Sequence, residues 1–467
     1  MLFNSIPFLL LVILTFSIYY LPIFQSLQTM VLIVASFVFY SWHFPVLTFL
    51  LAVSILINAF LSWAIVQRLK RKKELVTLGV ILNLAILIFF KYSPLIGVTF
   101  IRDDSWSDFL ISIPLPIGIS FFTFQGISLL VDAYRNTEGT SDQVRVLPFW
   151  KLLFNTSLYI SLFPQLVAGP IVKARDFYPQ IKTKYLSGVR WNYVFQHVVT
   201  GYFLKMVVAD NLKDFTGELV WPAFERFSSI ELLVYLFGYS MQIFADFAGY
   251  SLIAIGISGL FGYIIPQNFN FPYVASGFSD FWKRWHISLS TFLKEYLYIP
   301  LGGNRKGRGR TYLNLMVVMA LGGLWHGAAW SYMVWGTFHG LALVTERFLN
   351  NRGLSSLHPV YTIIKSMWVF FCVSLAWLLF KLPEFNHVIA WFKALSSNGS
   401  LYTDEIPLLY IFTLSFPVIL YHGWYLVSEK NRGNVFREKF KPALLGAMIT
   451  LIILNSGSPI DFIYFQF

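Results

Sequence analysis

Acidic and basic side chains are scarce in this sequence and are missing altogether from its first part. Asp, Glu, Lys and Arg make up 12% of the 467 residues, about half the share found in an ordinary soluble domain. None of them occurs before Arg68, and this uncharged stretch is long enough for three bilayer crossings of about 20 residues each. So few charges could not cover the surface of a soluble fold of this size. The sequence therefore predicts a membrane protein.

Other features are also absent. A single cysteine, Cys372, excludes a disulfide within the chain. The apolar stretch 6–24 has neither the basic start nor the small-residue cleavage site of a secretory leader, so we expect it to be a retained first span. No cluster of His, Cys, Asp or Glu has the spacing of metal ligands, and no metal site or cofactor is predicted. The net charge of +12 lies in short clusters between apolar runs, which indicates loops facing anionic lipid and no binding of nucleic acid.

What the chain has in abundance is long apolar runs. They predict an all-α polytopic membrane protein with about 11–12 transmembrane helices. Residues 1–467 are expected to form a single transmembrane domain, with a tail at 456–467 that emerges outside. The runs fall at 6–24, 28–46, 47–67, 75–98, 111–131, 193–208, 229–262, 312–330, 331–347, 361–382, 406–427 and 441–456.

Basic loops give the expected orientation. The cluster at 68–73 follows the third run and should be cytoplasmic, which places the N-terminus outside. The run 152–171 has basic residues on both flanks, so we interpret it as a re-entrant segment and not as a span. Its end, Phe163–Pro170, has two prolines that would break a continuous helix. Broken backbone at membrane depth lines a cavity or is buried in protein, so this end, which carries Gln165, is a candidate pocket wall.

Polar residues inside the apolar runs mark candidate functional positions, because ionisable groups are costly there. Two stripes each lie on one helical face: Gln125, Ser128 and Asp132, and then Gln242, Asp246 and Tyr250. Either stripe could line a pocket, or it could form hydrogen bonds between helices. The residues alone leave both interpretations open.

Two histidines are candidates for catalysis. His326 lies in an apolar run between Gly323 and Gly327. Such glycines let helices approach closely, and they also leave space for a narrow substrate beside the imidazole. A neutral imidazole there could accept the proton of an attacking hydroxyl; the alternative is a hydrogen-bonded structural histidine. His286 follows Lys283 and Arg284, which could bind a phosphorylated donor such as a coenzyme A thioester or anchor the segment 264–311 to lipid headgroups.

These motifs resemble a known family. Phe278–Ser290, Tyr296–Arg305 and the Leu-Trp-His-Gly sequence at 324–327 closely resemble bacterial membrane-bound O-acyltransferases of the alginate, peptidoglycan and surface-polysaccharide type. The resemblance implies a ring of tilted helices around a thin core, with a tunnel between the two faces, in the inner (cytoplasmic) membrane. It also implies that His326 is the catalytic base and that His286 is a second catalytic residue. The candidate residues lining the tunnel are Gln125, Gln165, Asp246 and Trp325.

The resemblance extends to the aromatic C-terminal tail. A tail with this many rings should dock on the outer interface or enter a groove, and Tyr464 becomes a candidate acyl carrier, with an interfacial anchor as the alternative. The expected function is transfer of an acetyl group from a cytoplasmic thioester, acetyl-CoA, toward polysaccharide or peptidoglycan. The expected partners are that donor, membrane lipid and an extracytoplasmic acetyltransferase. The alternatives are a D-alanyl or lipid acyltransferase, or a transporter.

Overall fold

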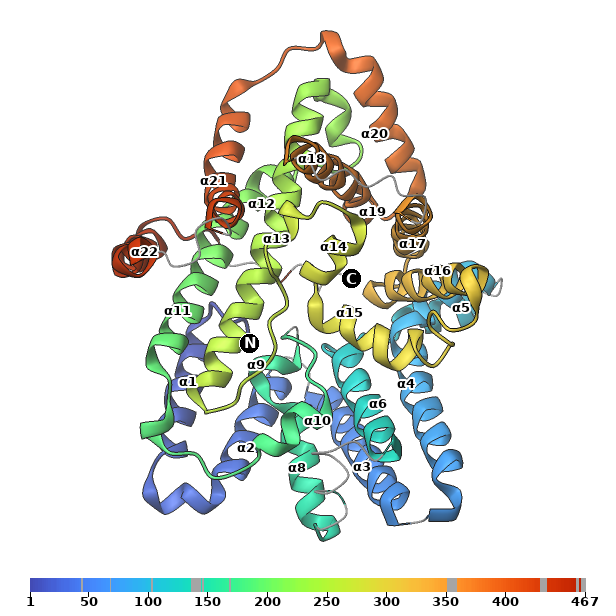
Figure 1. Cartoon of the computed structure of the whole chain (residues 1–467), viewed down its shortest axis with the longest axis vertical. Coiled ribbons are helices and arrows are strands. Elements are labelled where there is room, and N and C mark those ends of the chain that lie inside the picture. The colour runs from blue at the N-terminus through green and yellow to red at the C-terminus, as the bar shows by residue number, and fades with distance from the viewer. Residues whose placement is uncertain are drawn as a thin grey trace. The chain divides into compact units, whose positions relative to one another are not determined.

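The computed structural model describes residues 1–42, 45–67, 69–101, 104–135, 144, 147–167, 169–350, 359–428, 435–458 and 462. These residues form helices and connecting segments, with no β-strand among them (Figure 1). The chain divides into two compact units. The first comprises Met1–Val198 and Ser251–Pro266, and the second comprises Val199–Tyr250 and Gln267–Phe467. That residues 1–467 form a single transmembrane domain stays a prediction.

The first unit contains the helices of the N-terminal apolar runs. Helix α1 begins after Ser5, whose hydroxyl accepts a hydrogen bond from the Phe8 amide, and Pro7 occupies a position in its first turn where no amide donor is needed. The elements are α1 (Ile6–Tyr19), η1 (Pro22–Leu27), α2 (Gln28–Ser41), α3 (Pro45–Gln67), η2 (Leu69–Arg71), α4 (Lys72–Phe100), α5 (Asp104–Ser112), α6 (Ile119–Arg135), α8 (Phe149–Ser161), α9 (Phe163–Leu166), α10 (Ala174–Phe177), η3 (Tyr178–Gln180), η4 (Leu186–Gly188) and the start of α11 (Trp191–Tyr202).

The second unit contains the helices that carry both histidine motifs. It holds the end of α11, the π-helix η5 (Phe203–Ala209), α12 (Asp210–Thr216), η6 (Ala223–Arg226), most of α13 (Ser229–Leu260), η7 (Pro272–Val274), α14 (Phe278–Arg284), α15 (Ile287–Leu293), the π-helix η8 (Lys294–Tyr298), α16 (Gly307–His326), α17 (Trp330–Asn350), α18 (Pro359–Ala376), α19 (Leu378–Lys381), α20 (Phe385–Ser397), η9 (Asn398–Ser400), α21 (Glu405–Ser428) and α22 (Val435–Leu454).

The all-α polytopic membrane fold is confirmed. Six of the described helical segments are long and apolar enough to cross a bilayer: Pro22–Ser41, Pro45–Gln67, Lys72–Phe100, Ser229–Leu260, Tyr361–Lys381 and Glu405–Leu426. Each matches a predicted run, and two shorter apolar helices, Ile6–Tyr19 and Phe440–Leu454, match two more. The other predicted runs also form helices, but these are shorter or more polar. The larger number of spans, the ring and the tunnel stay predictions.

The predicted break in the run 152–171 is present. Helix α8 ends at Ser161, and Pro164 lies in the first turn of the four-residue helix α9. Residues 170–173 are then non-helical and buried. The backbone is thus broken inside the first unit and covered by protein, as broken backbone requires in a membrane. Ala168, within this segment, lies outside the described residues.

The glycines beside His326 pack two helices together. A Cβ atom at Gly323 would lie 2.1 Å from the carbonyl oxygen of Tyr332, and one at Gly336 would lie 2.1 Å from that of Met319. Helices α16 and α17 therefore approach closely, as predicted. The space expected at Gly327 is not empty, because the Tyr332 ring fills it: a Cβ there would lie 2.2 Å from that ring. The expectation of open space at this glycine was wrong.

This packing predicts a sharp sensitivity to one methyl group. We expect Gly336→Ala to lower the yield of folded protein severely, because the new carbon overlaps backbone that cannot turn away; the cost should exceed about 3 kcal/mol. The measurement is the monodisperse fraction in size-exclusion chromatography after extraction in detergent. The matched control is Gly446→Ala in α22, where a Cβ would meet nothing within 4 Å. Equal yields of the two variants would contradict this account of the α16–α17 contact.

Candidate active site

His326 is the last residue of α16, where the predicted run 312–330 is interrupted. The next residue, Gly327, is extended, and α17 begins three residues later. The imidazole is 3% exposed and is surrounded by aromatic rings, with centroids 5.2 Å away at Trp325, 5.3 Å at Trp335 and 5.3 Å at Phe380. The carbonyl dipoles at the end of a helix stabilise positive charge. The position therefore favours an imidazole that receives a proton during a reaction.

His286 lies beside His326, with ring centroids 6.3 Å apart, and Trp325 contacts both rings. It stands between α14 and α15 in a left-handed conformation, with φ of 43°, which is costly for a residue with a side chain and is found mainly at functional positions. Its side chain is fully buried. Burial lowers the pKa of this imidazole, which lies outside the six candidate spans, to about 3. The ring is therefore neutral at physiological pH.

The junction that carries His286 is held by an extended strip of chain. The backbone amide of Ile287 donates to the carbonyl of Asn268 at 2.9 Å, and the hydroxyl of Ser288 donates to the Asn268 side chain at 2.6 Å. Two residues along, the amide of Asn270 donates to the carbonyl of Arg284 at 2.9 Å. These bonds grip the chain on both sides of His286, so its unusual backbone is maintained by its surroundings.

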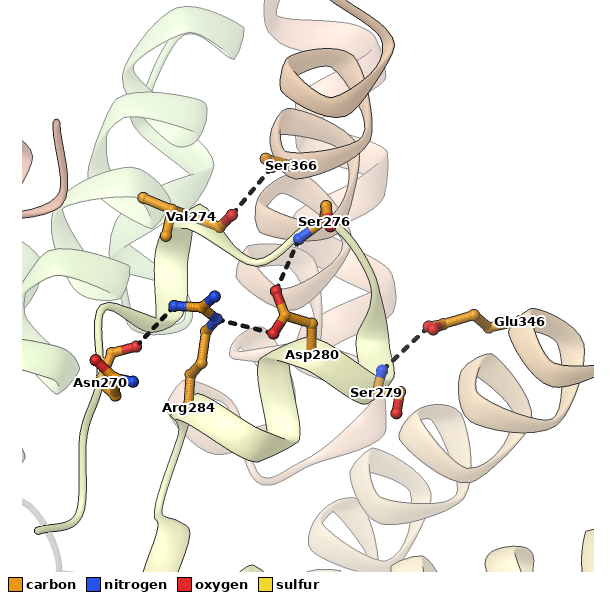
Figure 2. A network of polar contacts seen from close by, with 8 residues as sticks. All are labelled: Asn270, Val274, Ser276, Ser279, Asp280, Arg284, Glu346 and Ser366. Carbon is orange, nitrogen blue, oxygen red and sulfur yellow. Dashed lines mark hydrogen bonds and ion pairs between the residues drawn. The ribbon is translucent and has the colours of Figure 1, made fainter. Parts of the chain in front are cut away.

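A polar network joins α14 and the segment before it to neighbouring parts of the second unit (Figure 2). The Arg284 guanidinium donates to Asp280 at 2.9 Å and to the carbonyl of Asn270 at 3.3 Å. The start of α14 is tied to α17, because the amide of Ser279 donates to Glu346 at 3.1 Å. Ser366 of α18 donates to the carbonyl of Val274 at 3.1 Å. Arg284 thus has partners within the protein and helps to position the His286 segment, whereas Lys283 is exposed. A donor-binding role for either residue stays a prediction.

The C-terminal tail enters this part of the molecule. After α22, the amide of Gly457 donates to the carbonyl of Met206 at 2.9 Å. Phe462 is 1% exposed, with its ring 4.5 Å from that of Tyr250 and 5.7 Å from that of Phe247. The Phe247 ring in turn lies 4.7 Å from His286. Phe462 is therefore packed inside the second unit, and the choice between docking on the outer interface and entry into a groove stays a prediction for the rest of the tail. Tyr464 lies outside the described residues.

Asp246 belongs to a buried charge cluster. The ammonium group of Lys205, in the π-helix η5, lies 2.7 Å from one carboxylate oxygen of Asp246 and 2.7 Å from one of Asp210. All three side chains are buried. The other members of the stripe on α13 also have partners: Gln242 accepts a hydrogen bond from Thr216 at 2.5 Å, and Tyr250 stacks on Phe462. Bonding between helices, one of the two open interpretations, is thus present along this face.

The other two candidate tunnel residues lie in the first unit. Gln125 of α6 and Gln165 of α9 each donate a hydrogen bond of 2.9 Å to the carbonyl of Tyr159. Ser128 bonds to the Tyr159 hydroxyl at 3.0 Å and accepts from the amide of Ala174 at 2.9 Å. These contacts join α6 to the broken segment after α8, again as bonding between helices. Whether Gln125, Gln165, Asp246 or Trp325 lines a tunnel stays a prediction.

Several residues of the site were not singled out from the sequence. Trp335 and Phe380 contact His326, and Phe247 contacts His286, but aromatic residues are so common in this chain that no signal distinguishes them. Lys205 did carry a signal, since it is a lone charge within the predicted span 193–208 and should have been paired with an acid. Among the described residues, no three His, Cys, Asp or Glu side chains come together as a metal site.

Comparisons with known proteins identify the family of this chain. The model of the membrane-bound O-acyltransferase family matches residues 104–383. The chain is 33% identical to the probable alginate O-acetylase AlgI of Pseudomonas putida, over 87% of this chain and 82% of the relative. It is 35% identical to the peptidoglycan O-acetyltransferase of Helicobacter pylori, over 80% and 74%. It is 27% identical to the teichoic acid D-alanyltransferase of Bacillus subtilis, over 58% and 70%.

The chain therefore belongs to the membrane-bound O-acyltransferase family. It is a multi-pass membrane protein and an acyltransferase. Both histidine motifs lie inside the matched region.

Proposed function

We propose that this protein moves an acetyl group from a cytoplasmic thioester, acetyl-CoA, toward hydroxyl groups of a cell-surface polysaccharide or of peptidoglycan, in the inner membrane. The observation that carries the proposal is the pair of buried imidazoles, His286 and His326, with ring centroids 6.3 Å apart. Two relatives that match most of this chain are named for O-acetylation of alginate and of peptidoglycan, which supports the choice of acyl group and acceptor.

The chemistry assigned to His326 is general-base catalysis. A hydroxyl oxygen attacks the thioester carbonyl carbon while the neutral imidazole takes the hydroxyl proton. The carbon–sulfur bond then breaks, and the leaving thiolate takes a proton back from the imidazolium, so coenzyme A leaves as the thiol. The helix dipole at the end of α16 stabilises the imidazolium between these two steps. His286, buried and neutral beside it, orients the reacting groups.

The first acceptor in this proposal is the Tyr464 phenol of the same chain. Phe462 lies two residues before it and is seated against Phe247 and Tyr250, and two residues of extended chain span at most about 7 Å. A phenol is an adequate nucleophile when a base removes its proton, and its ester stays reactive for onward transfer. A separate extracytoplasmic acetyltransferase would then pass the acetyl group to the polymer.

The carrier role predicts a large effect of one hydroxyl group. We expect Tyr464→Phe to reduce the O-acetyl content of the envelope polymer to the level of a strain that lacks the protein, because the ring remains but the ester cannot form. The measurement is acetate released by mild alkali from purified polysaccharide and from peptidoglycan. Tyr402→Phe, at a tyrosine that is 86% exposed, is the control. Full acetylation of the polymer in the Tyr464→Phe strain would contradict the carrier role.

Two further readouts separate the remaining alternatives. A D-alanyltransferase, the activity for which the Bacillus subtilis relative is named, would leave D-alanine and not acetate in the alkali extract. A transporter would leave the thioester intact, whereas the proposed enzyme releases free coenzyme A from it. If the alkali extract contains no acetate and the protein releases no coenzyme A from the thioester, the proposal is overturned.

A further inference from the structure

A polar cavity of about 570 Å³ lies in the first unit. This unit contains neither His286 nor His326. It is bordered by the turn between α1 and α2, by the start of α8 and by the loop 181–183. Its lining includes Gln25, Gln28, Lys151, Asn155, Lys182 and Tyr263. Two of the lining residues are lysines, and none of those that the structure describes there is acidic. A cavity with this balance is suited to an anion.

One wall of the cavity is rigid although it is a loop. The side-chain amide of Gln28 donates to the carbonyl of Lys184 at 2.9 Å, and its oxygen accepts from the amide of the same residue at 2.8 Å. At the other end of the loop, Gln180 pairs with Ile264 in the same way, at 2.9 and 2.8 Å. These two amide pairs fix the loop on both sides of Lys182. The lysine is therefore carried on a preorganised backbone, which lowers the entropy cost of binding.

An unused hydrogen-bonding group faces the cavity. Asn155 of α8 is only 7% exposed and lines the cavity, and its side chain makes no hydrogen bond to another described residue. Buried amides are normally paired, so this side chain has capacity left for a ligand. The site also has surplus positive charge. Burial, and then the nearby charge of Lys182, lower the pKa of Lys184 to about 8, and its ammonium group lies 4.7 Å from the centre of the Tyr263 ring.

Exposed apolar residues stand close in sequence to residues that line the cavity. Ile23 and Leu27 flank Gln25 in the turn before α2, and Trp150 precedes Lys151; all three are exposed. In a membrane protein exposed aliphatic side chains face lipid, and exposed tryptophan is typical of the headgroup layer. Lys151 and Lys182 belong to the basic flanks of the run 152–171, and basic flanks predict the cytoplasmic face, which carries anionic lipid. The polar, cationic interior of the cavity is thus accompanied by nearby exposed apolar residues of the kind that contact acyl chains.

We infer that this cavity binds a phosphate ester, and that its source is the headgroup of an anionic membrane lipid. Lys151 and Lys182 neutralise the phosphate, Asn155 donates a hydrogen bond to it, and the acyl chains leave over Ile23, Leu27 and Trp150. The inference goes beyond the proposed acyl transfer and does not depend on it, since all of these residues lie in the first unit, which contains neither His286 nor His326.

The test is native mass spectrometry of the full-length protein in detergent, titrated with phosphatidylglycerol and, as the phosphate-free counterpart, with diacylglycerol. We expect phosphatidylglycerol to bind and diacylglycerol to bind much more weakly. The double variant Lys151→Ala, Lys182→Ala should weaken phosphatidylglycerol binding by ~10-fold or more. Asn155→Leu, which keeps the volume and all charges, should also weaken it. The matched control is Lys72→Ala, Lys73→Ala, which removes two lysines of the same unit outside the cavity and should bind like the parent protein.

Two further arms separate the outcomes. Adenosine 3′,5′-bisphosphate is added as a soluble phosphate ester. If it displaces the lipid, and if only its own binding depends on Lys151 and Lys182, the cavity binds a soluble phosphate ester and not a lipid headgroup. If both lysine pairs weaken phosphatidylglycerol binding equally, the attraction is diffuse and the site is refuted. The His326→Ala protein should bind phosphatidylglycerol unchanged, so failure of the acyl-transfer mechanism would not be mistaken for failure of this site. A thermal melt of each variant checks that it is folded.

Discussion

His326→Ala should abolish release of coenzyme A from acetyl-CoA while the protein stays folded. The imidazole is buried among Trp325, Trp335 and Phe380 at the end of α16, and in this account it is the group that takes the proton of the attacking hydroxyl. Loss of a general base typically costs about 10²–10⁴-fold in rate. The measurement is thiol release over time from purified protein in lipid vesicles.

A cavity left by the alanine could loosen the aromatic cluster, so a second substitution is needed. His326→Gln keeps most of the volume and the capacity for hydrogen bonds but cannot accept the proton, and we expect it to be equally inactive. His387→Ala, at a histidine that stacks on Trp221 away from the cluster, is the control and should keep the parental rate. Parental rates in His326→Gln would remove this residue from the mechanism.

Lys205→Met should sharply lower the melting temperature of the protein. The lysine is the partner of both Asp210 and Asp246, at 2.7 Å from each, and all three groups are buried. Removing the cation leaves two carboxylates facing each other without solvent, and breaking a buried ion pair in this way costs about 3–5 kcal/mol. The chain after α22 is bonded next to this cluster, because the Gly457 amide donates to the carbonyl of Met206, the residue after Lys205. The measurement is the melting temperature in detergent.

The reason for the loss can be checked by removing the partners as well. Adding Asp210→Asn and Asp246→Asn to Lys205→Met replaces the uncompensated charges with neutral amides, and it should restore much of the melting temperature. Lys213→Met, at a neighbouring lysine of α12 outside the cluster, should be close to the parent. If Lys205→Met melts like the parent protein, the cluster does not hold this part of the fold together.

The helices could be predicted closely from the sequence because bilayer thickness imposes long apolar runs. The predicted run 229–262 corresponds to the helix Ser229–Leu260, and the predicted run 406–427 corresponds to the helix Glu405–Ser428. Prolines located the break after α8 for the same reason, since they forbid a continuous helix. Amphipathic helices such as α20 (Phe385–Ser397) were missed, because a surface helix needs no uniformly apolar sequence.

The partners of the polar residues could not be predicted in this way. The periodicity on α13 placed Asp246 on one face but could not show that Lys205 of η5 pairs both with it and with Asp210 of α12. The glycines around His326 were compatible both with open space and with close packing, and only the position of Tyr332 distinguishes them. The proximity of His286 to His326 depends on the left-handed turn after α14, which no local pattern indicates for a histidine.

The central claim is that His326 transfers an acetyl group to the end of this chain. It is tested most directly by the intact mass of the C-terminal peptide, isolated after the protein is incubated with acetyl-CoA. The account predicts one added acetyl group on Tyr464 in the parent protein and none in His326→Gln. An unmodified tyrosine during active turnover, or the same modification in both proteins, would contradict it.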